Sequence, residues 1–218
     1  GSEMCIRDSV EAPLGSRTKL TLPDGTLVWL NAGSRITYSQ GFGVGNRKIE
    51  LIGEGYFEVK RNEEVPFLVK TNSLLVKVLG TKFNFRDYPD DAEAIVSLSE
   101  GKVALNNLLK KEKEAFLLPN ERVVLNKKNG RMHVEYSTVS NALQWTNGYL
   151  FFDEELLPDV VKELERSYNV KIQIASDTLN TFRFYGNFVH REQNIQEVLE
   201  ALSATRKIHY IIEGHNIT

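Results

Sequence analysis

The 218-residue sequence predicts a mainly β N-terminal domain followed by a small α+β domain. Two observations support this prediction. Up to about Tyr136, apolar residues recur with the period of two that is typical of strands, and glycine or proline turns interrupt them at short intervals. After Tyr136, apolar residues recur at the i, i+3 and i+4 spacing of amphipathic helices, so the architecture changes there.

The first domain, over residues 10–136, is expected to contain short stacked strands in a β-helix-like or sandwich-like arrangement. Leu20 and Leu22 alternate with polar residues before the turn Pro23–Gly25, and Val28 continues the alternation. Further strands are predicted over residues 48–52, 56–60, 67–71, 74–78, 82–86, 94–98, 102–106, 121–125 and 132–136. The predicted turns between strands lie at Gly53, Gly55, Gly80, Pro89–Asp91, Gly101 and Asn129–Gly130.

A linker helix over residues 137–146 and a second domain over residues 147–218 are expected to follow. The second domain has the order β-α-β-β-α-β, a split βαβ unit. Its strands are predicted over residues 148–152, 170–174, 182–184 and 208–212, and its helices over residues 156–168 and 194–202.

Helix-end signals support these two helices. Pro158 is compatible with the first turn of a helix, and Asn169 can end that helix in a left-handed conformation. Asn194 precedes Glu197 by three residues, which is the spacing of a capping box.

Composition excludes several functions. The net charge of −2 provides no basic excess for nucleic acid, and the runs Lys110–Lys113 and Lys127–Lys128 are expected to be solvated turns. The glycine-rich segment Gly41–Gly45 is not followed by the lysine and helix of a phosphate-binding loop. The four histidines lack metal-ligand spacing, so we expect neither metal nor cofactor.

Residues 1–9 match neither the strand pattern nor a signal peptide, and we interpret them as an artefact of cloning or gene prediction. They contain Cys5, the only cysteine, so no disulfide within the chain is expected. No apolar run approaches the roughly 20 residues that span a bilayer.

Catalysis is not expected. On one strand Glu54 and Glu58 would lie roughly 13 Å apart, whereas the carboxylates of a glycosidase lie about 5 to 10 Å apart. The Gly33-Ser34 pair lacks the surrounding residues of a nucleophile elbow. The sequence therefore predicts a protein that is not an enzyme.

Aromatic residues are the best candidates for binding. Trp29, Phe57, Phe67 and Phe83 are predicted to face the core of the first domain. In the second domain the candidate partner contacts are Tyr149, Phe151, Tyr185 and Phe188, with Trp145 as a pivot between the domains. Exposed aromatic residues on a small domain indicate a protein interface, although packing between the two domains is an open alternative.

The ordered set of strand and turn segments resembles the periplasmic region of FecR-type anti-sigma factors, in the form found in Bacteroidetes. The resemblance is carried by Gly15–Ser34, Leu51–Val59, Pro66–Val69 and Val78–Asn84, and extends over nearly all of the chain after residue 12. The second domain is similar to the secretin and TonB short N-terminal type of domain.

The resemblance implies a function without catalysis. The chain would bind the N-terminal signalling domain of a TonB-dependent outer-membrane transporter, and the signal would pass to a cytoplasmic sigma factor of the extracytoplasmic-function (ECF) class. It implies the periplasmic portion of a single-pass inner-membrane protein. Sigma-factor and membrane contacts would then belong to a cytoplasmic segment and a transmembrane helix that this chain lacks.

Two alternatives remain open from the sequence. A carbohydrate-binding β module would need an exposed aromatic platform, and the predicted inward position of Trp29 opposes it. A hydrolase built of stacked strands would need clustered acids or a nucleophile that the sequence does not show.

Overall fold

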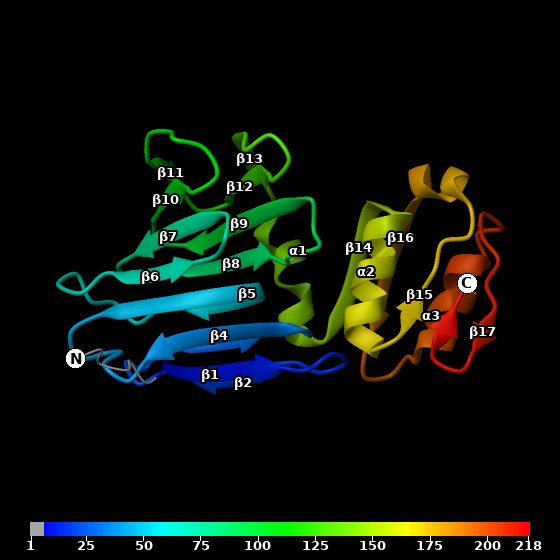
Figure 1. Cartoon of the computed structure of the whole chain (residues 1–218), viewed down its shortest axis with the longest axis horizontal. Coiled ribbons are helices and arrows are strands. Elements are labelled where there is room, and N and C mark those ends of the chain that lie inside the picture. The colour runs from blue at the N-terminus through cyan, green and yellow to red at the C-terminus, as the bar shows by residue number, and fades with distance from the viewer. Residues whose placement is uncertain (1–6) are drawn as a thin grey trace, which may run out of the picture. The chain divides into compact units, whose positions relative to one another are not determined.

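The protein was analysed as a computed structural model that describes residues 7–218 (Figure 1). The chain divides into two compact units. Unit 1 contains residues 7–13 and 17–143, and unit 2 contains residues 14–16 and 144–218. The predicted class, a mainly β N-terminal region followed by a small α+β region, is confirmed.

Unit 1 is built almost entirely of strands. They are β1 (Arg7–Ala12), β2 (Thr18–Thr21), β3 (Leu27–Leu30), β4 (Ser34–Ser39), β5 (Arg47–Glu58), β6 (Phe67–Lys70), β7 (Leu74–Val78), β8 (Lys82–Asp87), β9 (Glu93–Glu100), β10 (Val103–Asn107), β11 (Ala115–Leu117), β12 (Glu121–Asn126) and β13 (Met132–Tyr136), followed by the short helix α1 (Val139–Ala142). The main path of the sheet is β11-β10-β7-β6-β5-β8-β9-β12-β13. Because β11 also contacts β12, the sheet is nearly closed and barrel-like.

The long strand β5 replaces two predicted strands and the turn between them. Its first half pairs with β4 and β6, and its second half pairs with β3 and β8 (Figure 1). Gly53 lies at the change of partners with φ of +99°, a conformation that side chains disfavour. The glycine signal was therefore correct about backbone geometry, but the prediction of a turn is wrong because this glycine lies within a continuous strand.

The expectation that residues 1–9 stand outside the fold does not hold for residues 7–9. Arg7, Asp8 and Ser9 form the first half of β1 and pair with β4 in antiparallel register. Residues 1–6, including Cys5, lie outside the described residues. No strand was predicted at the positions of β1, β4 or β11.

Strand alternation explains the core of unit 1. Phe57, Phe67 and Phe83 are fully buried, as predicted, and the rings of Phe57 and Phe83 stack with centroids 5.1 Å apart. The prediction for Trp29 is wrong. Its neighbours Val28 and Leu30 are both fully buried, so alternation turns Trp29 to the opposite, partly exposed face.

On that outer face Trp29 packs against Tyr56, with ring centroids 5.3 Å apart. Burial and the nearby Glu58 carboxylate, whose Oε1 accepts a hydrogen bond from the Tyr56 hydroxyl, raise the pKa of Tyr56 to about 12. The folded state thus favours the neutral phenol. Its contribution to stability is complete below the usual pKa of 10.0 and is lost as the pH rises through about 12.

An ultraviolet titration of tyrosinate tests this prediction. We expect the Tyr56→Phe variant to lack one ionisation near pH 12. We expect the Glu58→Gln variant to show the Tyr56 ionisation at lower pH, because the carboxylate no longer opposes the phenolate. An unchanged titration curve in the Tyr56→Phe variant would contradict the assignment.

Unit 2 contains two small sheets and two helices. Its elements are η1 (Gln144–Asn147), β14 (Tyr149–Leu156), α2 (Leu157–Tyr168), β15 (Lys171–Ile172), η2 (Asp177–Thr181), β16 (Arg183–Val189), α3 (Ile195–Ser203), β17 (Ile212–Glu213) and β18 (Asn216–Ile217). Strands β14 and β16 pair in one sheet, and the other sheet has the order β15-β18-β17.

The predicted helices of unit 2 are confirmed with their ends. Pro158 lies in the first turn of α2, and Asn169 ends it with φ of 51°. The side chain of Asn194 accepts a hydrogen bond from the backbone N–H of Glu197 at 2.9 Å and caps α3. Both helices pack their apolar faces into the core of this unit.

The predicted last strand, residues 208–212, is wrong. The chain has no strand over residues 208–211 and instead forms the hairpin β17–β18 around Gly214, whose φ is 63°. Ile217, beyond the predicted strand, is buried and pairs with Ile172. The alternation of Ile208, Tyr210 and Ile212 predicted a strand over these residues. The turn at Gly214 instead places the paired residues later in the chain, in β17 and β18.

Candidate functional site

The aromatic residues predicted to bind a partner fall on both faces of the β14–β16 sheet. Tyr149, Phe151 and Tyr185 belong to its outer face, because they alternate with residues that are buried. Tyr185 is the most accessible of them, with 65% of its surface exposed, and the other two are partly exposed. These three side chains form the outer aromatic face.

The expected exposure of Phe188 is wrong. Phe188 has the same strand phase as Phe184, and both pack in the core of unit 2. The ring of Phe188 folds over Gly186, where an added Cβ atom would lie 2.5 Å from it. Trp145 is also buried, at 6% exposure. Neither side chain is available at the surface as a large contact.

The backbone of β16 adds hydrogen-bonding groups beside the outer aromatic face. The N–H of Leu157 donates to Phe182 O, and the N–H of His190 donates to Gly148 O, at opposite ends of the β14–β16 pairing. In an antiparallel pair the backbone groups of alternate residues point to opposite sides. The N–H and C=O groups of Tyr185 and Asn187 therefore point away from β14, where no strand pairs with β16 among the described residues.

An acidic bulge borders this face. The register of β14 shifts between Phe152 and Glu155, and Glu154 has φ of 57° there. Partial burial and the carboxylates of Glu154 and Asp153 raise the pKa of Tyr185. The exposed aromatic ring thus stands beside negative charge, an arrangement suited to a partner that presents cationic and apolar groups.

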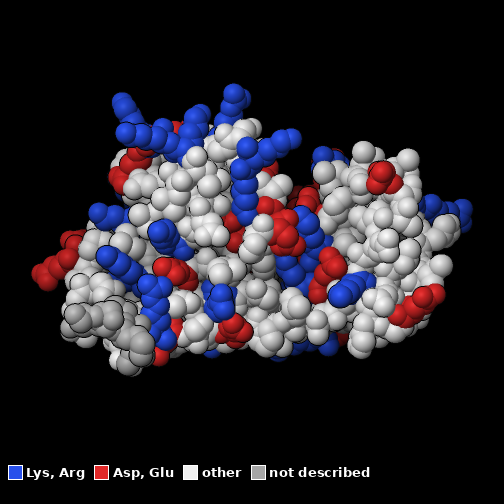
Figure 2. Space-filling view, viewed as in Figure 1, with Lys and Arg blue, Asp and Glu red and all other residues white. Residues whose placement is uncertain are grey.

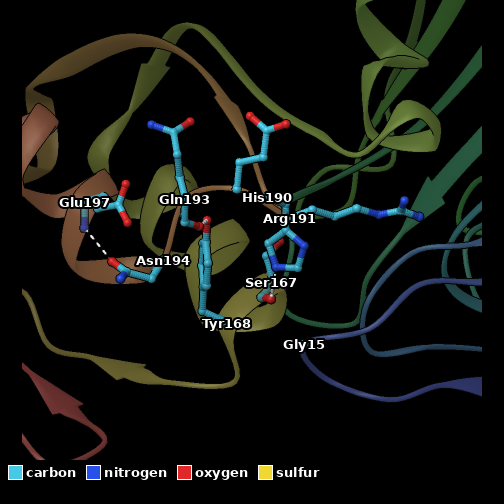
Figure 3. A pocket seen from close by; sticks show the side chains of 9 residues that line it. Gly15, Ser167, Tyr168, His190, Arg191, Gln193, Asn194 and Glu197 are labelled. Carbon is cyan, nitrogen blue, oxygen red and sulfur yellow. Dashed lines mark hydrogen bonds between the residues drawn. The ribbon is translucent and has the colours of Figure 1, made fainter.

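A shallow pocket of about 410 Å³ lies elsewhere in unit 2, at the C-terminal end of α2 and the N-terminal end of α3 (Figure 3). Its polar groups mainly bond to each other. The hydroxyl of Tyr168 donates to Gln193 O at 2.7 Å, and Nε2 of His190 lies 2.6 Å from Ser167 O. We interpret these contacts as holding the two helix ends and the β16–α3 connection together.

Charged side chains gather on the loops of unit 1. Lysine and arginine side chains project from the β10–β11 and β12–β13 loops (Figure 2). Lys110 is exposed and pairs with Glu112 at 3.4 Å, in agreement with the prediction of a solvated turn. The prediction is wrong for Lys127, because only 20% of its side chain is exposed and its Nζ lies 2.6 Å from the carboxylate of the buried Asp87 and donates to Tyr88 O at 2.6 Å.

Glu54, one of the two carboxylates considered for glycosidase chemistry, has a structural role. Glu54 is buried, and its two oxygens accept hydrogen bonds of 2.9 Å from the side-chain amides of Asn31 and Asn84. Within residues 7–218, no group of three or more metal-ligating side chains is close enough to hold an ion. In the same residues, no helix combines the length and the apolar character needed to cross a membrane.

The alternative of a carbohydrate platform gains little from the outward position of Trp29. Nζ of Lys19 lies 4.6 Å from the centre of the Trp29 ring, and Tyr56 packs against the same ring. The protein's own side chains therefore occupy part of the aromatic surface that a sugar would stack on.

Comparison with known proteins agrees with the division of the chain. Residues 8–104 match the FecR protein family, and residues 149–218 match the family described as FecR, C-terminal. No curated protein matches the chain.

Two crystal structures of a candidate anti-sigma factor from Parabacteroides distasonis ATCC 8503 are similar over almost the whole chain. One, at 1.65 Å resolution, is 33% identical, with a TM-score of 0.87, and the match covers 96% of this chain and 97% of that one. The other, at 2.50 Å, is 32% identical with the same TM-score and covers 97% of each chain. The chain therefore belongs to the FecR family.

Proposed function

We propose that this chain is the periplasmic sensor part of a transmembrane anti-sigma factor. In this proposal unit 2 binds the N-terminal signalling domain of a TonB-dependent outer-membrane transporter. The resulting signal passes to a cytoplasmic ECF sigma factor through parts of the protein on the other side of the membrane. FecR family members are regulators and not enzymes, so the function of this chain is binding.

The observation that carries the proposal is the similarity, over almost the full length, to a candidate anti-sigma factor. The docking surface we assign is the outer aromatic face with the adjacent edge of β16. An added strand would satisfy the backbone groups of Tyr185 and Asn187, while the Tyr185 ring would cover apolar groups of the partner. The acidic bulge at Asp153 and Glu154 would favour a partner with cationic side chains.

A calorimetric titration against signalling domains of transporters encoded beside the gene tests the partner. We expect one of these domains to bind with micromolar or tighter affinity and the others not to bind. We expect Tyr185→Ala to weaken that binding at least tenfold, the effect of losing about 1.4 kcal/mol at an aromatic contact. Ile211→Ala is the matched control, because Ile211 is an equally exposed apolar residue of the same unit that lies outside β14 and β16.

A backbone substitution separates strand addition from side-chain contact. Asn187→Pro removes an N–H that points away from β14, so the β14–β16 pairing should persist while strand addition is blocked. Asn187→Ala keeps the N–H and should bind normally. Absence of binding to every adjacent signalling domain would contradict the proposed partner. Binding that is unaffected by both Tyr185→Ala and Asn187→Pro would contradict only the assigned surface.

A further inference from the structure

A short segment between the first two strands of unit 1 belongs to unit 2. Leu14–Ser16, here called the inserted segment, lies between β1 and β2 in the sequence but is part of unit 2. The chain therefore passes between the two units three times: before the inserted segment, after it, and between Leu143 and Gln144. Two domains joined by a single linker would be connected only once.

The inserted segment completes the C-terminal end of α2. The last carbonyl groups of a helix have no partner within the helix and need donors from elsewhere. The N–H of Gly15 donates to Arg166 O at 2.7 Å, and Nε2 of His190 lies 2.6 Å from Ser167 O. Gly15, Ser167 and His190 line the same pocket (Figure 3). Two neighbouring carbonyl groups at the end of α2 are thus paired by groups from outside the helix.

The backbone of Gly15 is suited to this contact. Its φ is 82°, a conformation that glycine adopts without strain. A Cβ atom added at Gly15 would lie 3.6 Å from Cβ of Asn169, the residue that ends α2. The inserted segment therefore lies directly against the end of the helix.

The chain is held in unit 1 on both sides of the inserted segment. On one side Ala12 is buried, and its carbonyl oxygen accepts the N–H of Gly33 at 2.8 Å. On the other side Nε of Arg17 donates to Oδ1 of Asn31 at 3.0 Å. Only residues 13–16 lie between these two points, and an extended chain spans at most about 3.3–3.6 Å per residue. The segment is therefore too short to let the units separate far while it stays bonded to α2.

We propose that the inserted segment couples the two units, so that they unfold together in one cooperative transition. Its hydrogen bond to α2 needs unit 1 to hold both ends of the segment and unit 2 to present the folded end of the helix. The contact forms within one chain, at the high effective concentration that a short connection gives. Unfolding of either unit breaks this contact, so each unit stabilises the other.

The alternative is a loop that lies on unit 2 without contributing to its stability. The connection after Leu143 would then be the only one that matters, and the two units would unfold independently, as domains with a small interface do. The two cases differ in whether the unfolding transitions of the units coincide.

Urea unfolding followed by one tryptophan in each unit distinguishes these cases. Trp29 reports on unit 1 in a Trp145→Phe background, and Trp145 reports on unit 2 in a Trp29→Phe background. With the inserted segment unchanged, we expect the two reporters to give coincident transitions, as a single cooperative unit does.

Gly15→Pro should separate the two transitions. It removes the N–H that donates to Arg166 O, and proline cannot adopt the φ of 82°. We expect the midpoints of the two units to differ by at least about 0.5 M urea. Gly15→Asn is the matched control: asparagine keeps the N–H and tolerates a left-handed conformation, so the transitions should still coincide. Separate transitions with Gly15 unchanged, or coincident transitions in Gly15→Pro, would overturn the proposal.

A disulfide tests the same contact in its closed state. In a Cys5→Ser background, Gly15→Cys combined with Asn169→Cys should form a disulfide on mild oxidation, because the Cβ separation of 3.6 Å lies within the range of about 3.5–4.5 Å found in disulfides. The transitions of the oxidised protein should coincide and lie at higher urea than those of the reduced protein. Failure to cross-link would show that the inserted segment does not lie at the end of α2, and would also overturn the proposal.

Discussion

Replacing Arg47 with methionine is expected to destabilise unit 1 by about 3–5 kcal/mol, the usual cost of breaking a buried ion pair on one side. Arg47 is 2% exposed, and its NH1 lies 3.2 Å from the carboxylate of Asp24, which is itself almost inaccessible. Methionine fills a similar volume but leaves the Asp24 charge in the interior without its counterion.

The guanidinium also holds two connecting segments, β5–β6 and β7–β8, through their carbonyl groups. It donates to Val65 O at 2.7 Å, to Lys60 O at 2.6 Å, to Asn62 O at 3.1 Å and to Leu79 O at 3.3 Å. A methionine side chain satisfies none of these acceptors, and each buried carbonyl without a donor is costly. The expected loss therefore exceeds that of an ordinary core truncation in which no polar group is left behind.

Urea unfolding in a Trp145→Phe background measures this effect, because Trp29 then reports on unit 1 as the only tryptophan. Arg35→Met is the control: Arg35 is an exposed arginine that pairs with Glu11 at 3.3 Å. Exposed pairs contribute about 0–1 kcal/mol, so this variant should unfold nearly as the parent does. Equal stability of the two variants would show that Arg47 does not hold the connecting segments.

Features that depend only on residues close in sequence could be predicted from the sequence. The helices α2 and α3 were predictable with their ends, because Pro158, Asn169 and Asn194 act within a few residues of their own position. Most strands of unit 1 were predictable from their alternation in the same way. The role of Arg47 was not, since its partners come from Asp24 and from loops that only the folded sheet brings to the start of β5.

The candidate site was predictable in part for the same reason. Strand phase places Tyr149, Phe151 and Tyr185 on one face, and the same rule applied to Phe188 gives the buried position that the structure shows. The free edge of β16 could not be predicted, because an edge is defined by which strand fails to pair. That depends on the topology of the whole sheet.

Gly53→Ala is expected to destabilise unit 1 by about 2–5 kcal/mol, the sum of roughly 1–2 kcal/mol for a side chain at positive φ and about 1–3 kcal/mol for overpacking. The added Cβ atom would lie 2.3 Å from Oγ of Ser34 and 2.9 Å from its Cα atom. A rotamer change of Ser34 could relieve only the first contact. The second involves the backbone of β4, which pairs with β5.

The displacement of Ser34 would also break a buried hydrogen bond, since its Oγ accepts the N–H of Glu54 at 2.8 Å. Gly45→Ala is the matched control: a Cβ atom there meets nothing within 4 Å. Because alanine reduces the freedom of the unfolded chain, Gly45→Ala should be neutral or slightly stabilising. If Gly53→Ala unfolds at the urea concentration of Gly45→Ala, then β5 does not need glycine at the point where it changes partners.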